Sequence, residues 1–263
     1  MTRPLAYLAA ALLVAAGCQR YRRAGASYGL EASYLTAGIK SFTAGLSGET
    51  PVDLPGRAGL PGQTDVWGGE LAYANGPDIY GAGYSKILLT GRTTVADQDI
   101  TFGGQTFTVG TDIRTRANFD IYKVFVANRA TDRSGGVNQF AFVLEFLDFD
   151  ISIRDDATPA NVGRFDRRAP MLLLGYQWET VGSGSGTVYF AKIEWMDLDV
   201  IRIGRTGGNF TDLTAGLKWY LGGPNARSQL VIAYRYFEAN LDIDGEKMYL
   251  SFDGPVVGLS AWF

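Results

Sequence analysis

The sequence predicts an all-β fold: a closed antiparallel up-and-down β-barrel that crosses a membrane, with about ten strands, or eight if the first hairpin lies outside the wall. Three observations predict it. Segments in which apolar and polar side chains alternate are long, and strands of about ten or more residues are typical of membrane-spanning barrels. Compact turns alternate with longer connections rich in Gly and Pro. The last segment alternates up to a terminal Phe263.

The first residues have the pattern of a signal peptide. Residues 1–17 contain Arg3, an apolar stretch and small residues before Cys18, the order found before a cleavage site. The segment VAAGC also resembles the lipobox of bacterial lipoproteins, which predicts lipidation of Cys18, with ordinary cleavage nearby as the alternative. Because Cys18 is the single cysteine, no intrachain disulfide is possible. We expect residues 18–28 to form a periplasmic leash and residues 29–263 the barrel.

Alternating segments and turn signals then follow each other along the chain. The expected strands lie near residues 29–46, 66–76, 79–95, 111–128, 137–154, 169–180, 186–201, 208–221, 228–244 and 247–263. Connections such as NGPD and VGSGSG are short, whereas residues 47–65, 96–110 and 155–167 are longer. Outer-membrane barrels have short periplasmic turns and longer external loops, so an even strand count places both chain ends in the periplasm.

The connections carry further signals. Within the second long connection, DITFGGQTFTV predicts a hairpin with a Gly-Gly turn. The segment RFDRR, from Arg164 to Arg168, is expected to be a basic, plainly solvated external loop, with contact to lipopolysaccharide phosphates as the alternative. Trp178, Trp219 and Trp262 lie close to the expected periplasmic strand ends, where aromatic rings favour the membrane interface.

Three segments shift the parity of their alternation: AFVLEFLDFDISIR, KIEWMDLDV and AYRYFEANLDI. In the first, Phe146 and Leu147 are adjacent and the alternation then resumes on the other parity. A β-bulge resets parity in this way. We therefore expect Phe149 to continue the lipid-facing stripe of Phe142. The alternative is that each strand ends at the shift and its charges lie in water.

With such bulges the charged side chains gather in the lumen. Arg114 and Arg116 are expected to face aspartates of the next strand, and unpaired buried ions are costly. Arg235 is expected to pair with Asp212. The predicted lumen charge network comprises Arg114, Arg116, Asp120, Glu145, Asp148, Asp150, Lys192, Glu194, Asp197, Asp199, Asp212, Arg235, Glu238 and Asp242. A ten-strand barrel filled in this way is not expected to conduct large solutes.

The composition argues against several function classes. The chain has no histidine, which removes Ser-His-Asp catalysis, the usual zinc ligands and the His-dependent chemistry of outer-membrane hydrolases. The net charge of -3 gives no basic footprint for nucleic acid. Asp148 with Asp150, or Asp197 with Asp199, remain weaker alternatives as catalytic acids, and these four aspartates with Asp242 and Asp244 remain one as ligands of calcium or magnesium. We expect no enzymatic activity, no cofactor and no metal site.

Four segments carry a resemblance to a family of uncharacterised small outer-membrane β-barrel proteins of Gram-negative bacteria. They are VDLPGRAGL, ITFGGQTFTVGTDIRTRANFDIYKV, YRYFEANLDIDG and FDGPVVGLSAWF. The resemblance covers nearly the whole chain after the signal peptide. It implies the fold and an outer-membrane location, and it implies no catalytic residues.

These observations together favour a non-enzymatic outer-membrane barrel with a structural or surface-interaction role, a charged lumen and external binding loops. The alternative is a narrow pore or a lateral route for small or hydrophobic molecules. The expected partners are outer-membrane lipid, lipopolysaccharide and, during biogenesis, the barrel-assembly machinery, which recognises terminal strands resembling VVGLSAWF.

Overall fold

The chain forms a closed antiparallel barrel with ten strands in its wall. The computed structural model describes residues 26–132, 135–181, 186–197, 206–221 and 227–263. The predicted fold class and strand number are therefore confirmed. Within the described residues, no helix has the length and apolar character needed to cross a membrane.

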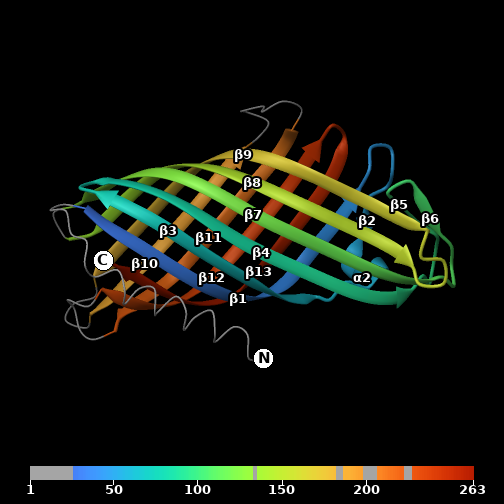
Figure 1. Cartoon of the computed structure of the whole chain (residues 1–263), viewed down its shortest axis with the longest axis horizontal. Coiled ribbons are helices and arrows are strands. Elements are labelled where there is room, and N and C mark those ends of the chain that lie inside the picture. Colours follow the sequence, from blue (N-terminus) through green and yellow to red (C-terminus); the bar gives the residue numbers. More distant parts are fainter. Residues whose placement is uncertain (1–25, 133–134, 182–185, 198–205, 222–226) are drawn as a thin grey trace.

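Each wall strand pairs with its neighbours in the chain, and β13 pairs with β1 to close the barrel (Figure 1). At this seam Gly29 lies opposite Trp262, and the amide of Tyr28 donates to the carbonyl of Phe263 at 3.1 Å. The wall strands are β1 (Ala26–Gly45), β3 (Gln63–Asn75), β4 (Asp78–Thr94), β7 (Asp112–Thr131), β8 (Val137–Asp155), β9 (Val162–Val181), β10 (Thr187–Asp197), β11 (Thr206–Tyr220), β12 (Ser228–Ile243) and β13 (Glu246–Trp262).

The barrel has two different ends (Figure 1). The terminal end holds the start of β1, the end of β13 and the tight β3–β4 turn around Gly76, which has a positive φ of 62°. The loop end holds the helix α2 (Leu54–Ala58), the short strand β2 (Val52–Asp53) and the hairpin of β5 (Ile100–Phe102) and β6 (Gln105–Phe107). The expected contrast between short turns and long connections is thus present.

The first long connection folds into the mouth of the barrel at the loop end. Asp53 caps α2 by accepting from the amide of Gly56 at 3.2 Å, and side-chain caps of this kind stabilise short helices. The carbonyl of Ala58 accepts a hydrogen bond from the Thr115 hydroxyl at 2.6 Å. Gly91 permits this approach, because a Cβ there would lie 1.9 Å from the carbonyl oxygen of Gly59.

The second long connection forms the predicted hairpin. Gly103 and Gly104 have positive φ angles of 61° and 75°, as a two-residue hairpin turn requires. The Glu49 carboxylate accepts from both of their amides, at 3.2 and 2.9 Å. The two long connections therefore hold each other over the mouth.

The third connection is shorter than expected, because β9 begins at Val162. The basic segment Arg164–Arg168 is part of this strand, so the expectation of a basic loop is wrong. The first strand also begins earlier than predicted, at Ala26, and the last residues of the expected leash belong to the wall. Cys18 and the signal-peptide segment lie outside the described residues.

The expected bulges are absent from the described strands. Along β7 and β8 the register runs without a shift from Ile113 opposite Asp155 to Thr131 opposite Val137, and β12 pairs with β13 equally regularly. A register shift occurs instead in β1, between Ile39 and Ser41. The parity shifts therefore need another physical cause.

Candidate functional site

The parity shifts mark the level at which the two faces of the wall exchange polarity. Phe142 lies before the shift in β8, and 66% of its surface is exposed on the outside of the barrel. Phe149 lies beyond the shift and is 0% exposed, inside the lumen. Because the strand stays regular, a change of side-chain parity moves the apolar residues from the outer face to the inner face. The expectation that Phe149 faces lipid is therefore wrong.

The outer face between the terminal end and the shifts forms an apolar belt. Two aromatic girdles border it, as in transmembrane barrels. Tyr28 packs against Tyr73 near the terminal end, with ring centroids 5.2 Å apart, and Tyr84 packs against Tyr122 near the shifts, at 5.1 Å. Exposed apolar side chains between them include Leu71, Val124, Val126, Phe140, Phe142, Leu172, Leu174, Ile193, Leu213 and Ile232.

Tyr84 of the girdle near the shifts, and Tyr34 of β1, connect apolar surface to polar groups of the outer face. The Tyr84 hydroxyl donates to Asp120 at 2.5 Å, and the Tyr34 hydroxyl donates to Asp65 at 2.6 Å. A tyrosine whose ring lies among apolar groups and whose hydroxyl reaches a carboxylate is suited to a membrane–water interface.

Beyond the shifts the lumen is filled by apolar side chains, and we call its largest members the phenylalanine plug. Phe149 contacts Phe165 with ring centroids 5.3 Å apart, and Phe237 stacks on Phe252 at 4.6 Å. Phe102 of the hairpin at the loop end packs onto the plug from that end. The plug residues are Phe42, Phe102, Phe107, Phe119, Phe149, Phe165, Phe210, Phe237 and Phe252, all essentially without solvent exposure.

On the terminal side of the plug the lumen is polar and hollow. A vestibule of about 380 Å³ is lined by residues of the terminal end, among them Ser27, Arg129, Gln139, Arg227 and Trp262. A central cavity of about 140 Å³ adjoins it, since the two share Glu31, Glu70, Gln177 and Lys218 as lining residues. The lumen thus consists of a half with polar cavities and a plugged half.

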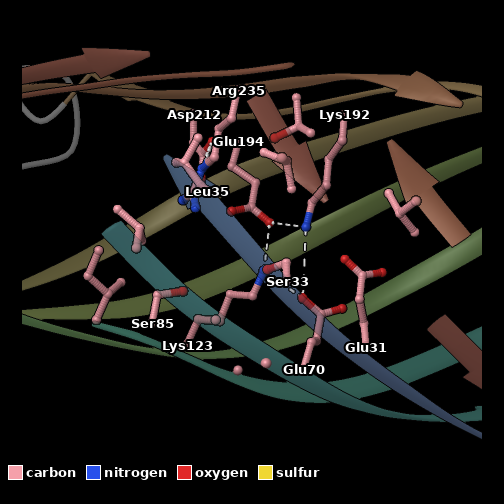
Figure 2. A pocket seen from close by; sticks show the side chains of 18 of the residues that line it. Glu31, Ser33, Leu35, Glu70, Ser85, Lys123, Lys192, Glu194, Asp212 and Arg235 are labelled. Carbon is pink, nitrogen blue, oxygen red and sulfur yellow. Dashed lines mark hydrogen bonds and ion pairs between the residues drawn. The ribbon is translucent and has the colours of Figure 1, made fainter. Parts of the chain in front are cut away.

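Charged side chains around the central cavity form a network of ion pairs (Figure 2). Lys123 lies 2.7 Å from Glu70 and 3.4 Å from Glu194. Lys192 lies 2.8 Å from the same Glu194. These charges come from β3, β7 and β10 and are positioned by inward-facing strand positions, so the network ties distant strands together across the lumen.

A second pair in the cavity is the one that the sequence predicted. Arg235 donates to both oxygens of Asp212, at 2.9 and 2.6 Å, and the pairing is confirmed. Two parallel hydrogen bonds of this kind are strong and geometrically specific. Nearer the terminal end, Lys218 reaches Glu179 at 2.5 Å.

The structure divides the predicted charge network into two sets. Five of its members line the central cavity: Glu145, Lys192, Glu194, Asp212 and Arg235. The others in the described residues lie at outward-facing strand positions: Arg114, Arg116, Asp120, Asp148, Asp150, Asp197, Glu238 and Asp242. Placing that second set in the lumen was an error, because the polar face beyond the shift is the outer one. Asp199 lies outside the described residues.

The expected partners of the arginines also differ. Arg114 lies opposite Arg154, and Arg116 lies opposite Ser152. Asp148 pairs instead with Arg168 of β9. Of the tryptophans expected at the interface, Trp178 and Trp219 are exposed on the outer face, whereas Trp262 lines the vestibule, where the Arg129 guanidinium lies 5.5 Å from its ring.

Sequence inspection missed Glu70 and Lys123, which are central to the network. Each is a single charged residue at an inward-facing position of its strand. Its neighbours in the sequence face outward and are apolar: Leu71 beside Glu70, and Tyr122 and Val124 beside Lys123. A charge at such a position has only the lumen to face. This signal was available but is weak, because one charge in an alternating strand is also usual in a soluble sheet.

The chain resembles solved outer-membrane barrels. No protein-family model matches it, and no curated protein matches it. The translocator domain of the autotransporter NalP from Neisseria meningitidis is 12% identical, with coverage of 98% of this chain and 95% of that one and a TM-score of 0.44. Neisserial surface protein A is 8% identical, with coverage of 90% and 97% and a TM-score of 0.32. The toluene transporter TbuX of Ralstonia pickettii is 10% identical, with coverage of 92% and 90% and a TM-score of 0.29. Similarity at this level concerns the fold alone.

Proposed function

We propose that the protein is a non-enzymatic barrel of the Gram-negative outer membrane, sealed on its external side, with a structural or surface-interaction role. The terminal end faces the periplasm, and the loop half stands beyond the bilayer. The apolar belt between two aromatic girdles supports this placement, because such a belt needs a lipid environment.

The observation that carries the proposal is the phenylalanine plug. An apolar filling whose side chains are essentially without solvent exposure is the interior of a packed core, and interiors of this kind exclude ions. The loop half therefore combines an apolar interior with a polar outer surface, as a water-soluble domain does. It serves as a rigid extension that presents its outer strands and the cap of long connections to the outside.

The first test is electrical conductance. We expect the purified protein in planar lipid bilayers to show no steady conductance across a range of voltages, because the plug closes the path from the vestibule to the outside. Liposome swelling with small sugars is expected to be absent as well.

An open porin incorporated in the same lipid is the positive control, and refolding is verified by the circular dichroism of the barrel. A steady conductance, or swelling that depends on solute size, would contradict the sealed barrel and favour the narrow pore instead. Uptake of hydrophobic molecules into cells without swelling would favour a lateral route.

For a surface partner we propose the phosphate groups of the outer-leaflet glycolipid, lipopolysaccharide. Near the loop end of the wall, Arg92, Arg114 and Arg154 lie directly opposite each other on β4, β7 and β8. Two residues further along the strands, Arg116 of β7 and Arg164 of β9 lie opposite Ser152 of β8, one on each side of it. Like charges at opposite positions are destabilising, and bound phosphate relieves their repulsion through bidentate contacts.

Only part of this repulsion is relieved within the protein. Asp156 lies 3.8 Å from Arg92 and 3.4 Å from Arg114. Within the described residues, Arg116, Arg154 and Arg164 form no ion pair, and they occupy outward-facing positions toward the loop end of the wall. They are therefore the arginines most available to a phosphorylated lipid.

We expect the double variant Arg116→Ala, Arg164→Ala to bind purified phosphorylated lipid A about tenfold more weakly than the unaltered protein, since each arginine contributes a charge-assisted contact. Surface plasmon resonance on the protein in micelles measures this. Lys247→Ala removes an exposed cation from β13 and is the matched control. Equal weakening by both variants would indicate a general charge effect and would contradict a defined phosphate surface.

The two ends of the chain carry the proposed signals for export, anchoring and assembly of the barrel. We propose a signal peptide over residues 1–17 and a lipid on Cys18. The described barrel begins at Ala26, at the terminal end and close to Phe263, which suits an anchor in the periplasmic leaflet. The terminal strand ending at Phe263 is proposed as the signal recognised by the barrel-assembly machinery.

A further inference from the structure

The central cavity contains more carboxylates than its cations can neutralise. Lys123 and Lys192 are both occupied by Glu70 and Glu194, at distances from 2.7 to 3.9 Å. Figure 2 shows how these four side chains close on each other. Neither lysine is therefore free to pair with a further carboxylate.

The other cations near the cavity are committed as well. Arg235 makes both of its close contacts with Asp212, and Lys218 reaches Glu179 on the vestibule side. The cationic groups that line the cavity therefore each have a carboxylate partner already.

Glu145 is the carboxylate left over. Its residue is 3% exposed, and its Oε1 atom is buried without a hydrogen-bond partner. Lys123 lies opposite it in the β7–β8 register, yet the Lys123 ammonium turns to the acids of β3 and β10. A buried carboxylate without a partner is costly, and a positive group from outside the protein would offset this cost.

A second acid of the cavity is in a similar position. Glu31 lies directly opposite Glu70 in the β1–β3 register, and it lines both the central cavity and the vestibule. Among the described residues it forms no ion pair. Glu31 thus adds negative charge to the path by which a ligand from the terminal end reaches Glu145.

We propose that the central cavity binds a small aliphatic amine, with one ammonium group at Glu145 and the remainder of the molecule extending past Glu31 toward the vestibule. An ammonium group has three donors and needs several acceptors around it. The Glu145 carboxylate supplies acceptors for one ammonium group, and the hydroxyls of Ser33 and Ser85 line the same cavity for the rest of the molecule.

An organic cation fits better than a metal ion. No group of three or more Asp, Glu, His or Cys residues in the described part of the chain is arranged to hold a metal. A cavity of about 140 Å³ also exceeds the space that one ion with its water needs, since a single water occupies on the order of 10–15 Å³ by this measure. The vestibule leaves room for a chain with a second ammonium group.

This inference goes beyond the proposed function, because it requires only that the vestibule be open at the terminal end. It concerns what enters the barrel from the periplasmic side, and conductance does not bear on it. Amine binding and conductance are measured separately, so either can fail without the other.

The test uses 1,4-diaminobutane as the probe and the full chain refolded in micelles. Isothermal titration calorimetry measures binding to the unaltered protein, to Glu145→Gln and to Glu238→Gln. The last variant makes the same change on the outer face of β12 and is the matched control. We expect the unaltered protein and the control to bind the diamine, and Glu145→Gln to bind at least tenfold more weakly.

Thermal unfolding supplies a second measurement that does not depend on the Glu145 variant. The midpoint of the unaltered protein is expected to rise with diamine concentration, and Glu31→Gln is expected to reduce that rise. The proposal is overturned if the diamine does not bind, or if Glu145→Gln binds it as well as the unaltered protein does. It is equally overturned if sodium, potassium or calcium ions raise the midpoint and the diamine does not. A protonated Glu145 is indicated if no cation affects the midpoint, and this too overturns it.

Discussion

Replacing Arg235 by Met is expected to lower the free energy of unfolding by about 3–5 kcal/mol, the usual cost of removing one partner of a buried ion pair. Arg235 makes two hydrogen bonds to Asp212 in the lumen. Without the guanidinium, Asp212 remains as a buried charge beside Glu145 and Glu194, which line the same cavity. The lumen then holds three carboxylates with reduced compensation.

Equilibrium unfolding in urea, with the barrel in lipid vesicles and tryptophan fluorescence as the signal, measures this loss. The double variant Arg235→Met, Asp212→Leu is the control, because replacing a whole buried pair by apolar residues of similar volume is often neutral or stabilising. Recovery of most of the lost stability in the double variant is therefore expected.

Two outcomes would contradict the packing of this pair. A loss below about 1 kcal/mol for Arg235→Met is what a solvent-exposed salt bridge gives, and it would mean that the lumen is hydrated throughout. A double variant that is no more stable than the single one would show that the arginine acts through its packing against Phe237, from whose ring its guanidinium lies 5.8 Å, rather than through its charge.

The strands and the closure of the barrel could be predicted because their signals are local. Alternation with a period of two residues and glycine-rich turns are written into short segments. The Gly103-Gly104 hairpin is an example, since both residues have the positive φ that such a turn requires. The bulge in β1 was not predictable in this way, because the sequence around Lys40 has no pair of adjacent large apolar residues.

The face of each residue beyond the parity shifts could not be derived from the sequence alone. Adjacent apolar residues such as Phe146 and Leu147 arise when a bulge keeps one face apolar, and equally when a regular strand passes from lipid into water. Alternation states which residues share a face. It does not state whether lipid, water or a packed interior covers that face, which depends on the height of the whole wall relative to the bilayer.

The same ambiguity explains which of the predicted site residues were placed correctly in the lumen and which were not. Glu145 and Glu194 precede the shifts, where the inner face is the polar one, and both are buried in the lumen. Asp148 and Asp150 follow the shift, where the outer face is polar, and both lie outside. The shift itself was recognised, and the error lay in the medium assigned to the segment beyond it.

The exchange of polarity can be tested on two neighbouring residues of β8. Phe149→Ala is expected to lower the free energy of unfolding by about 3–5 kcal/mol, the cost of truncating a buried aromatic side chain and leaving a cavity. Phe149 packs between Phe119 and Phe165, with ring centroids 6.3 and 5.3 Å away, so its neighbours are held on both sides and the cavity does not collapse. Asp150→Ala is expected to change the stability by about 0.5 kcal/mol or less, as is usual for an exposed position.

Urea unfolding in lipid vesicles measures both variants, and their order separates the two arrangements. If the strand carried a bulge, Phe149 would face lipid and its truncation would leave no cavity, while Asp150 would lie in the lumen among charged partners. Asp150→Ala would then be the more damaging change. A loss for Asp150→Ala that exceeds the loss for Phe149→Ala would therefore show that the outer half of the lumen is polar, and the sealed barrel would have to be abandoned with it.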